Sequence, residues 1–315
     1  MKLRLCVNWL PITPELTRGL ARRVERAGLW GLGIGDSPNY GELYTACADA
    51  LSATDALAVL TSVTNPVTRH VSVHVSAART YGGRLAIGMG RGDSAVRTFG
   101  LRPATLPELE RTLESLREAV PEAPLLVAAG GPAAARVAGR AAGGVICGAG
   151  RDPQALAGLA GAAREAAGRP VDRWASVRLA VARTPAEVPG LRSRILPRAI
   201  SAARFNFGRD LAGKNVPDAL QEVLTARFAA YDFAWHGRAG GTPTARMFAD
   251  RPDVEEYLLD RFAVVGTAQD CRDRLADLHR HVDGIFLSLL FEDVLEQADR
   301  LADLFTPDEL ETLGR

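Results

Sequence analysis

The chain has 315 residues, of which 47% are hydrophobic and 24% charged, and its formal net charge at pH 7 is +1. A nearly balanced charge gives no indication of a nucleic acid or a membrane surface as partner. The four cysteines, Cys6, Cys47, Cys147 and Cys271, show no CxxC spacing, which argues against a zinc site and a disulfide framework. The apolar run near the start is too short for a signal peptide, and no stretch is long enough to span a bilayer. We therefore expect a soluble, cytoplasmic protein.

In the first part of the chain, buried apolar runs alternate with helical patterns. Strands are predicted over residues 3–10, 31–36, 56–63 and 84–90. Helices are predicted over residues 13–28, 44–54, 66–81 and 104–120. The first of these helices has Thr13 as its cap, Pro14 at its first position and Gly28 as its stop.

The second part continues this alternation and then interrupts it. Strands are predicted over residues 125–130 and 143–148, with a helix over 132–142 between them, and two further strands over 174–182 and 282–290. Residues 191–260 break the rhythm because they are largely helical. This segment is too long for an ordinary connection, so we interpret it as an insertion.

Eight buried strands separated by helices indicate an α/β protein with a parallel sheet covered on both faces. In a chain of this length, eight such units predict a closed (β/α)8 TIM barrel. We expect residues 1–315 to form one domain, with the helical segment at about 191–260 inserted over the barrel mouth. A doubly wound open sheet is the structural alternative, but its six or so strands would leave two units unexplained.

Polar and small residues occur where the predicted strands end. In a barrel these ends converge on one face, which carries the active site in essentially every characterised enzyme of this fold. The residues at or just after strand ends are Asp36, Ser62, Thr64, Asn65, Arg91, Asp93, Gly130, Gly131, Gly148 and Arg151.

Two of these strand ends form glycine-rich turns. Small residues allow backbone N–H groups to approach an anion closely, and the helix that starts near Pro132 adds its N-terminal dipole. The alternative is that the glycines only make tight turns between strand and helix. If the first interpretation holds, a phosphate is bound by Ala129, Gly130, Gly131, Gly148 and Ala149, with Arg151 as the charged partner.

The turn "TSVTNP" follows the third predicted strand. Asn65 precedes Pro66 and is expected to be extended, which would place Thr64 and Asn65 across the mouth. At the end of the second strand, Asp36 either caps the next helix or contacts a cofactor ring.

The stretch "GMGRGDSAVRTFG" follows the fourth predicted strand. Gly90 and Gly92 bracket Arg91, and Asp93 comes next. A carboxylate beside an arginine at a barrel mouth is either an acid–base group or a plain salt bridge.

Other catalytic patterns are missing from the sequence. No nucleophile elbow or Ser/His/Asp order occurs, and the few histidines and scattered carboxylates disfavour a metal site. A phosphate site beside a polar mouth therefore favours a bound organic cofactor that supplies the chemistry.

The stretches "TSVTNP", "GMGRGDSAVRTFG", "VAAGGPAAARVAGRAAGGVICGAG" and "FAVVGTAQDCRDRL" together resemble the bacterial luciferase-like superfamily of flavin- and deazaflavin-dependent oxidoreductases. The likeness covers roughly residues 5–150 and 260–290. It is greatest to the coenzyme F420 branch, which includes methylene-tetrahydromethanopterin reductase. The resemblance implies a TIM barrel with an inserted segment, a homodimer, and a cofactor at the carboxyl ends of the strands.

The resemblance also implies roles for individual residues. Ser62–Val63 matches a bulged strand in which the family has a cis peptide behind the deazaflavin ring, flanked by Thr64, Asn65 and Gly90. Asp36 and Asp93 match polar residues beside that ring. The loops that hold the cofactor's phosphate match Ala129, Gly130, Gly131, Cys147, Gly148 and Ala149.

Two departures from the family pattern narrow the substrate. The F420-dependent sugar-phosphate dehydrogenases have a histidine where this chain has Ser37, and a threonine where it has Gly148. The resemblance therefore argues against glucose 6-phosphate and favours a reductase, or a dehydrogenase of another compound.

The expected reaction is hydride transfer between C5 of the deazaflavin and an electrophilic carbon of a small organic substrate, in an actinobacterial natural-product setting. Asp93 or a bound water would donate the proton, and Arg91 would hold the substrate. Residues expected to line the substrate pocket are Asn8, Trp9, Ser37, Tyr231 and His236. The alternatives are an FMN-dependent monooxygenase supplied by a partner reductase and a non-catalytic flavin-binding homologue.

Overall fold

The computed structural model describes residues 3–207, 210–235 and 241–305, and its parallel strands close into a barrel. The strands pair in the order of the chain from the first to the seventh, and the last strand then pairs with both the seventh and the first. The barrel strands are β1 (Arg4–Trp9), β2 (Gly31–Ile34), β3 (Ala58–Thr64), β4 (Leu85–Met89), β5 (Leu125–Ala129), β6 (Gly144–Cys147), β7 (Asp172–Ala182) and β9 (Gly284–Ser288). The predicted TIM barrel is confirmed.

One strand lies outside the predicted set. β8 (Ala263–Thr267) pairs only with the second half of β7, from Arg178 opposite Ala263 to Ala182 opposite Thr267. β7 is eleven residues long, so it leaves the barrel after pairing with β9 and continues as a support for β8. β8 is only five residues long and lies between two helical patterns, so the periodicity of the sequence did not predict it.

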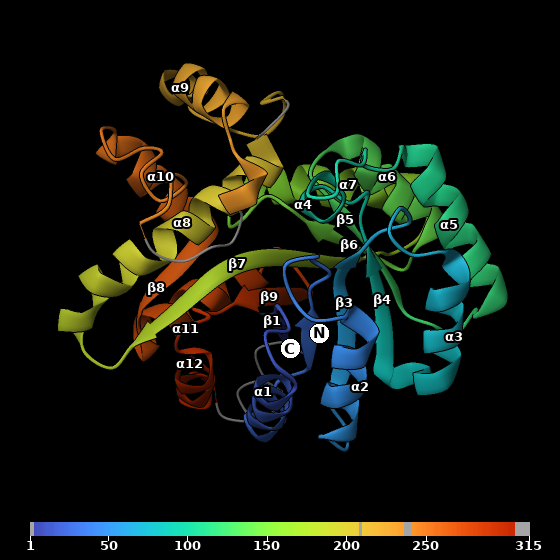
Figure 1. Ribbon diagram of the computed structural model, residues 1–315. Coiled ribbons are helices and arrows are strands. Elements are labelled where there is room, and N and C mark those ends of the chain that lie inside the picture. Colours follow the sequence, from blue (N-terminus) through green and yellow to red (C-terminus); the bar gives the residue numbers. More distant parts are fainter. Residues whose placement is uncertain (1–2, 208–209, 236–240, 306–315) are drawn as a thin grey trace.

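Helices cover the outside of the barrel between successive strands (Figure 1). Thr13 accepts a hydrogen bond from the amide of Leu16 at 3.2 Å, and Gly28 has a φ of +68°, so both predicted ends of the first helix are confirmed. The helices of this layer are α1 (Pro14–Arg26), α2 (Leu43–Ser52), α3 (Val71–Tyr81), α5 (Leu106–Ala119), α6 (Pro132–Ala141), α7 (Pro153–Ala167), α11 (Ala268–His279) and α12 (Val294–Leu301). The short helix α4 (Ser94–Arg97) follows β4.

The helix predicted over residues 66–81 begins later than expected. The side chain of Asn65 accepts hydrogen bonds from the amides of Val67 and Thr68, at 3.0 and 2.9 Å, and so forms a turn. His70 then accepts from the amide of Ser72 and caps α3. The segment from Pro66 to His70 is therefore a loop at the barrel mouth.

Between β7 and β8 the described residues include the α-helices α8 (Val188–Phe207), α9 (Asp218–Ala229) and α10 (Pro252–Phe262). Figure 1 shows α8, α9 and α10 gathered on one side of the barrel, next to the far end of β7. Their apolar side chains, among them Leu224, Phe228 and Leu258, form a core cluster together with Ala180 and Ala182 of β7.

A second apolar cluster fills the inside of the barrel. Because side chains alternate across a strand, one residue from almost every strand points inward at this level. The members are Cys6, Leu60, Ala86, Leu126, Ile146, Trp174 and Phe286.

Candidate active site at the carboxyl ends of the strands

The next inward-facing layer toward the barrel mouth consists of short side chains. It contains the residues two positions after each member of the inner cluster, which face the same way. None of them is larger than asparagine: Asn8, Ser62, Gly88, Ala128, Gly148, Ser176 and Ser288. Asn8, Ser62, Ala128, Gly148 and Ser176 are half-buried, whereas the inner cluster below them is buried. Most side chains of this layer are therefore more exposed to solvent than the inner cluster beneath them, whereas Gly88 and Ser288 are buried.

β3 is irregular where it reaches this layer. The peptide bond between Ser62 and Val63 is cis, as the resemblance implied, and the pairing with β4 shifts register between Thr61 and Thr64. Val63 packs against the inner cluster beside Ala128. The register resumes where the amide of Gly90 donates to the carbonyl of Thr64 at 2.8 Å.

Asp36 does not cap a helix. Glu42 caps α2 by accepting from the amide of Thr45 at 2.8 Å, which makes the capping interpretation of Asp36 wrong. The carboxylate of Asp36, only 8% exposed, instead forms an ion pair with Arg69 and accepts from the hydroxyl of Thr64 at 2.8 Å.

Arg69 is a member of this network that the sequence analysis missed. Its guanidinium also lies 3.1 Å from Glu42. Burial alone would lower the pKa of Arg69, but the Asp36 and Glu42 carboxylates outweigh it and raise the pKa. Arg69 lies in the segment that the sequence analysis assigned to a helix, so nothing in its pattern pointed to the mouth.

Of the two interpretations of Asp93, the salt bridge with Arg91 is wrong, and the acid–base role stays a prediction. Asp93, with a side chain 30% exposed, forms an ion pair with Arg97 one turn later, on α4. Arg91 directs its Nε to the carbonyl of Ala104, whose amide in turn donates to the carbonyl of Arg91 at 2.8 Å. The side chain and backbone of Arg91 thus fix the loop that leads to α5.

The two glycine-rich turns lie side by side, because the amide of Gly148 donates to the carbonyl of Ala129 at 2.9 Å. Gly131 occupies the cap position of α6, where no side chain caps the helix. A Cβ built on Gly131 would meet nothing within 4 Å. The space at Gly131, beside the N-terminus of α6, is therefore open, and the free amides of a helix N-terminus favour an oxyanion.

Cys147 and Ala149 belong to these turns only through their backbones. Both side chains are fully buried in the core between barrel and helices, and burial raises the pKa of Cys147 to about 12.

Arg151 does not serve these turns. Its guanidinium points to the carbonyl of Ala263, and burial and the nearby Arg274 lower its pKa. Arg261 of α10 instead holds the turn from behind, with its Nε 3.3 Å from the carbonyl of Ala149. Arg151 was the predicted charged partner because it is adjacent in the chain, whereas the supporting arginine comes from a helix 112 residues away.

The predicted pocket residues separate into different environments. The amide nitrogen of Asn8 donates to the hydroxyl of Ser288 at 3.1 Å, and its Oδ1 is buried without a partner in the described structure. Trp9 points away from the mouth, because its indole N–H donates to Thr17 of α1 at 3.0 Å, and its assignment to the pocket is wrong. Tyr231 is buried, with its hydroxyl 3.0 Å from that of Ser201. His236 lies outside the described residues.

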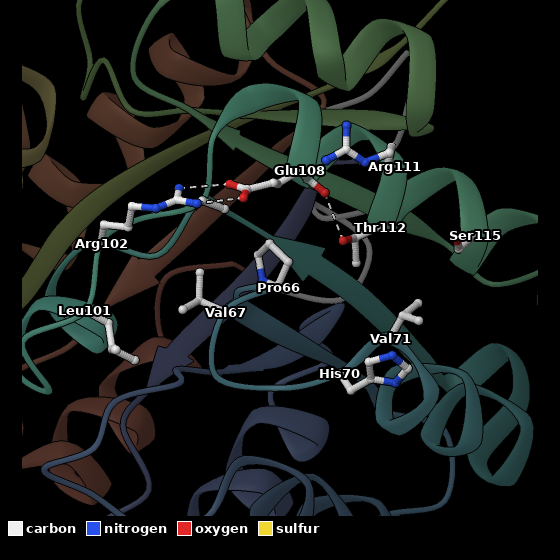
Figure 2. A pocket seen from close by; sticks show the side chains of 11 residues that line it. Pro66, Val67, His70, Val71, Leu101, Arg102, Glu108, Arg111, Thr112 and Ser115 are labelled. Atoms are coloured by element: carbon white, nitrogen blue, oxygen red, sulfur yellow. Dashed lines mark hydrogen bonds and ion pairs between the residues drawn. The ribbon is translucent and has the colours of Figure 1, made fainter.

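Two pockets lie near the rim of the mouth. One, of about 340 Å³, is formed by Asp36, Ser37, Tyr40, Arg69 and Phe99 with their neighbours, and so adjoins the Asp36 network. The larger one, of about 460 Å³, lies farther out between α3 and α5 (Figure 2). It is lined by Val67, His70, Arg102 and Glu108 among others and contains none of the predicted site residues.

The described part of the chain contains no group of three or more His, Cys, Asp or Glu side chains arranged to hold a metal ion. Each helix that the structure describes is too short or too polar to cross a membrane.

The sequence model of a protein family described as luciferase-like monooxygenase matches residues 11–283. No curated protein sequence matches the chain.

Several solved structures share this fold. The coenzyme F420-dependent tetrahydromethanopterin reductase from Methanopyrus kandleri is 17% identical, with a TM-score of 0.75 over 98% of this chain and 100% of that one. An F420-dependent secondary alcohol dehydrogenase is 14% identical, with a TM-score of 0.66 over 98% and 99%. The oxygenating constituent of 3,6-diketocamphane monooxygenase from Pseudomonas putida, in complex with FMN, is 14% identical, with a TM-score of 0.63 over 97% and 98%.

Proposed function

The chain belongs to the luciferase-like monooxygenase family, and from this premise we propose that it is an oxidoreductase using coenzyme F420 and a small organic substrate. The observation that carries the proposal is the layer of short, partly exposed inward-facing side chains, with the open space at Gly131 beside it. The expected homodimer, cytoplasmic location and natural-product setting stay predictions.

The residues present fit a tricyclic cofactor with a phosphate. A planar ring would rest on the layer that contains Ser62 and Ala128, with Val63 behind it. The phosphate would accept hydrogen bonds from backbone amides at Gly130, Gly131 and the first turn of α6, where the helix dipole favours negative charge. Asp36 would face the ring edge, held in place by Arg69 and Thr64.

Coenzyme F420, when bound, supplies a hydride carrier at C5 of its deazaflavin ring. The protein's task is then to orient two reactants and to limit the access of water. Asn8 and Ser288 offer polar atoms at the floor of the mouth, and α8 stands beside it. The role of Asp93 in proton transfer stays a prediction, since its ion pair with Arg97 holds the carboxylate at the rim.

The choice of F420 over FMN is supported by the sequence resemblance to the F420 branch. An FMN-dependent monooxygenase is the second candidate, because the 3,6-diketocamphane monooxygenase structure carries FMN in the same fold.

The test is a pair of binding titrations with purified protein, one with F420 and one with FMN, each oxidised and reduced. We expect F420 to bind and FMN to bind at least about tenfold more weakly, a difference of ~1.4 kcal/mol. Tight FMN binding without F420 binding would overturn the choice of cofactor. Binding of neither would overturn the proposed function.

Gly131→Ala tests the phosphate position. The backbone at Gly131 is extended, with a φ of −165°, and the new methyl group would meet no protein atom, so stability should be unchanged. The methyl would occupy the space proposed for the phosphate, and we expect the dissociation constant of the cofactor to rise about tenfold. Gly158→Ala, in α7 with open space around it, is the matched control. Equal cofactor affinity in both variants would show that the phosphate binds elsewhere.

A further inference from the structure

Two arginines lie at the mouth on the side of β7 and α8. Arg178 is two positions beyond Ser176 on the inward face of β7, and its register partner on β9 is Ser288. Arg198 lies on α8, where its guanidinium stacks 3.8 Å from the centre of the Phe291 ring. The two are near enough for the positive charge of Arg178 to lower the pKa of Arg198.

In each guanidinium group one buried nitrogen lacks the partner that buried charges normally have. The Nε of Arg178 and the Nη1 of Arg198 are buried without any hydrogen-bond partner in the described structure. Two other arginines with largely buried side chains pair with carboxylates instead, Arg69 with Asp36 and Arg261 with Asp152 at 3.7 Å. Unpaired buried charges are rare because the lost hydration is not replaced.

The electrostatics of the pair agree with this geometry. Burial lowers the pKa of Arg178 to about 10. Burial, followed by the positive charge of Arg178, lowers the pKa of Arg198 to about 9. Both side chains are therefore still charged at neutral pH. Glu292, the carboxylate whose charge acts on Arg198, lies instead 3.8 Å from Arg194.

The position of the pair separates it from the proposed phosphate site. Arg198 contacts Phe291, which follows β9. Tyr40, which follows β2, is near enough to influence the pKa of Arg198 electrostatically. In the barrel order, β9, β1 and β2 lie across the mouth from β5, which carries the turn at Gly130 and Gly131. One ligand phosphate cannot contact both places.

We propose that Arg178 and Arg198 form an oxyanion subsite that binds the carboxylate, or a comparable anionic group, of the substrate. This inference rests on the proposed function, because it names the substrate class of that same mouth. A planar carboxylate matches the donor fork of a guanidinium, and the ring of Phe291 holds Arg198 in place. An anion would supply the hydrogen bonds that the protein leaves unmade.

The probe is benzoate, compared with its neutral isostere benzamide, titrated calorimetrically at constant ionic strength with and without bound cofactor. We expect benzoate to bind at least about tenfold more tightly than benzamide. Arg178→Gln and Arg198→Gln should each abolish this preference while leaving the affinities for benzamide and cofactor unchanged. Arg192→Gln, on the same helix but paired with Glu256, is the matched control and should keep the preference.

Equal affinity for benzoate and benzamide, or an unchanged preference in both variants, would overturn the proposal. A loss of cofactor affinity in the two variants would assign the arginines to the cofactor's tail, which also overturns it. If no cofactor binds but the preference holds and is lost in the variants, the proposed function fails and the oxyanion subsite remains.

Thermal unfolding of the same variants gives a second readout without any ligand. Removing an unpaired buried charge should leave the melting temperature unchanged or raise it. A clear fall in both variants would indicate that the arginines serve the fold, and it would overturn the assignment.

Discussion

Some buried polar side chains in this protein have hydrogen-bond partners within the protein, and others do not. Asp36 has two partners, and the indole N–H of Trp9 has one. The Oδ1 of Asn8 and the Nε of Arg178 have none in the described structure, and both residues face the mouth. Unsatisfied buried groups lower the free energy of unfolding. Such atoms also occur away from the mouth, as at Nε2 of His74 and Nε1 of Trp174, so it is the position of Asn8 and Arg178 at the mouth that favours a ligand there.

His74 is a partly satisfied buried group with a consequence for stability, because its Nε2 is buried without a partner in the described structure. It is fully buried, and its Nδ1 lies 2.7 Å from the hydroxyl of Tyr44. Burial, followed by the charges of Arg69 and His70, lowers its pKa from 6.5 to about 4. In the unfolded chain the same imidazole takes up a proton near pH 6.5.

We therefore expect pH to alter stability through His74. Its neutral form contributes fully above about pH 6.5, and this contribution is lost as the pH falls toward 4, by at most about 3 kcal/mol. In urea unfolding between pH 7.5 and 4.5, His74→Gln should show a smaller loss of unfolding free energy than the wild type. Parallel pH profiles for the two proteins would contradict this assignment.

At the scale of elements, the turn after β6 depends on a glycine. Gly150 has a φ of +65°, and a Cβ there would lie 2.2 Å from the carbonyl oxygen of Arg261. The amide of Arg151 donates to that same carbonyl at 2.8 Å, so α10 is packed directly against the turn.

Gly150→Ala is expected to lower the free energy of unfolding by about 2 kcal/mol or more, from backbone strain and the contact with α10. The comparison is Gly158→Ala, which lies inside α7 with nothing within 4 Å and should gain about 1 kcal/mol. Chemical denaturation of both variants measures the difference. Equal stabilities would show that the turn can move away from α10.

The sequence predicted those elements whose patterns are local. The eight barrel strands and the caps of α1 follow from apolar runs, Thr13 and Gly28. β8 is five residues long, and its strand character depends on β7, so no local pattern identified it. The start of α3 was misplaced because the side chain of Asn65 forms a turn, which Pro66 alone did not reveal.

The candidate site was predicted in part for the same reason. The backbone turns at residues 129–131 and 147–149 could be located, because glycines after strands are a local signal. The side chains that meet at the mouth could not be predicted, because they come from separate elements. Asp36 meets Arg69 in this way, and Arg178 lies near Arg198. Arg91 and Arg151 were assigned to the site because they are adjacent in the sequence to predicted site residues, but their side chains point to backbone carbonyls elsewhere.

For the whole molecule, β7 joins the two parts of the core. Its residues alternate between the cluster outside the barrel, which includes Val177 and Leu179, and the cluster with α8 to α10, which includes Ala180 and Ala182. Neither part can lose β7 without exposing apolar surface of the other, which is the basis of cooperative unfolding.

Leu224→Ala tests this coupling. Leu224 of α9 is fully buried in the cluster with α8 and α10, and its truncation should lower the free energy of unfolding by about 2 to 5 kcal/mol. Urea transitions followed by circular dichroism and by tryptophan fluorescence should coincide. Leu113→Ala, in α5 against the barrel, is the matched control. Two separated transitions would show that residues 191–260 unfold independently of the barrel.

The alternation along β7 also limits how the gene can change in length. Trp174 closes the barrel floor, Arg178 faces the mouth and Ala182 lies beneath α8, all on one side of the same strand. Adding or deleting one codon between 174 and 182 would turn Leu179 into the mouth or bury Arg178 against the outer helices. Length differences among homologous chains are therefore expected in the connection at 183–187, and an alignment with a gap inside β7 would compare the wrong residues.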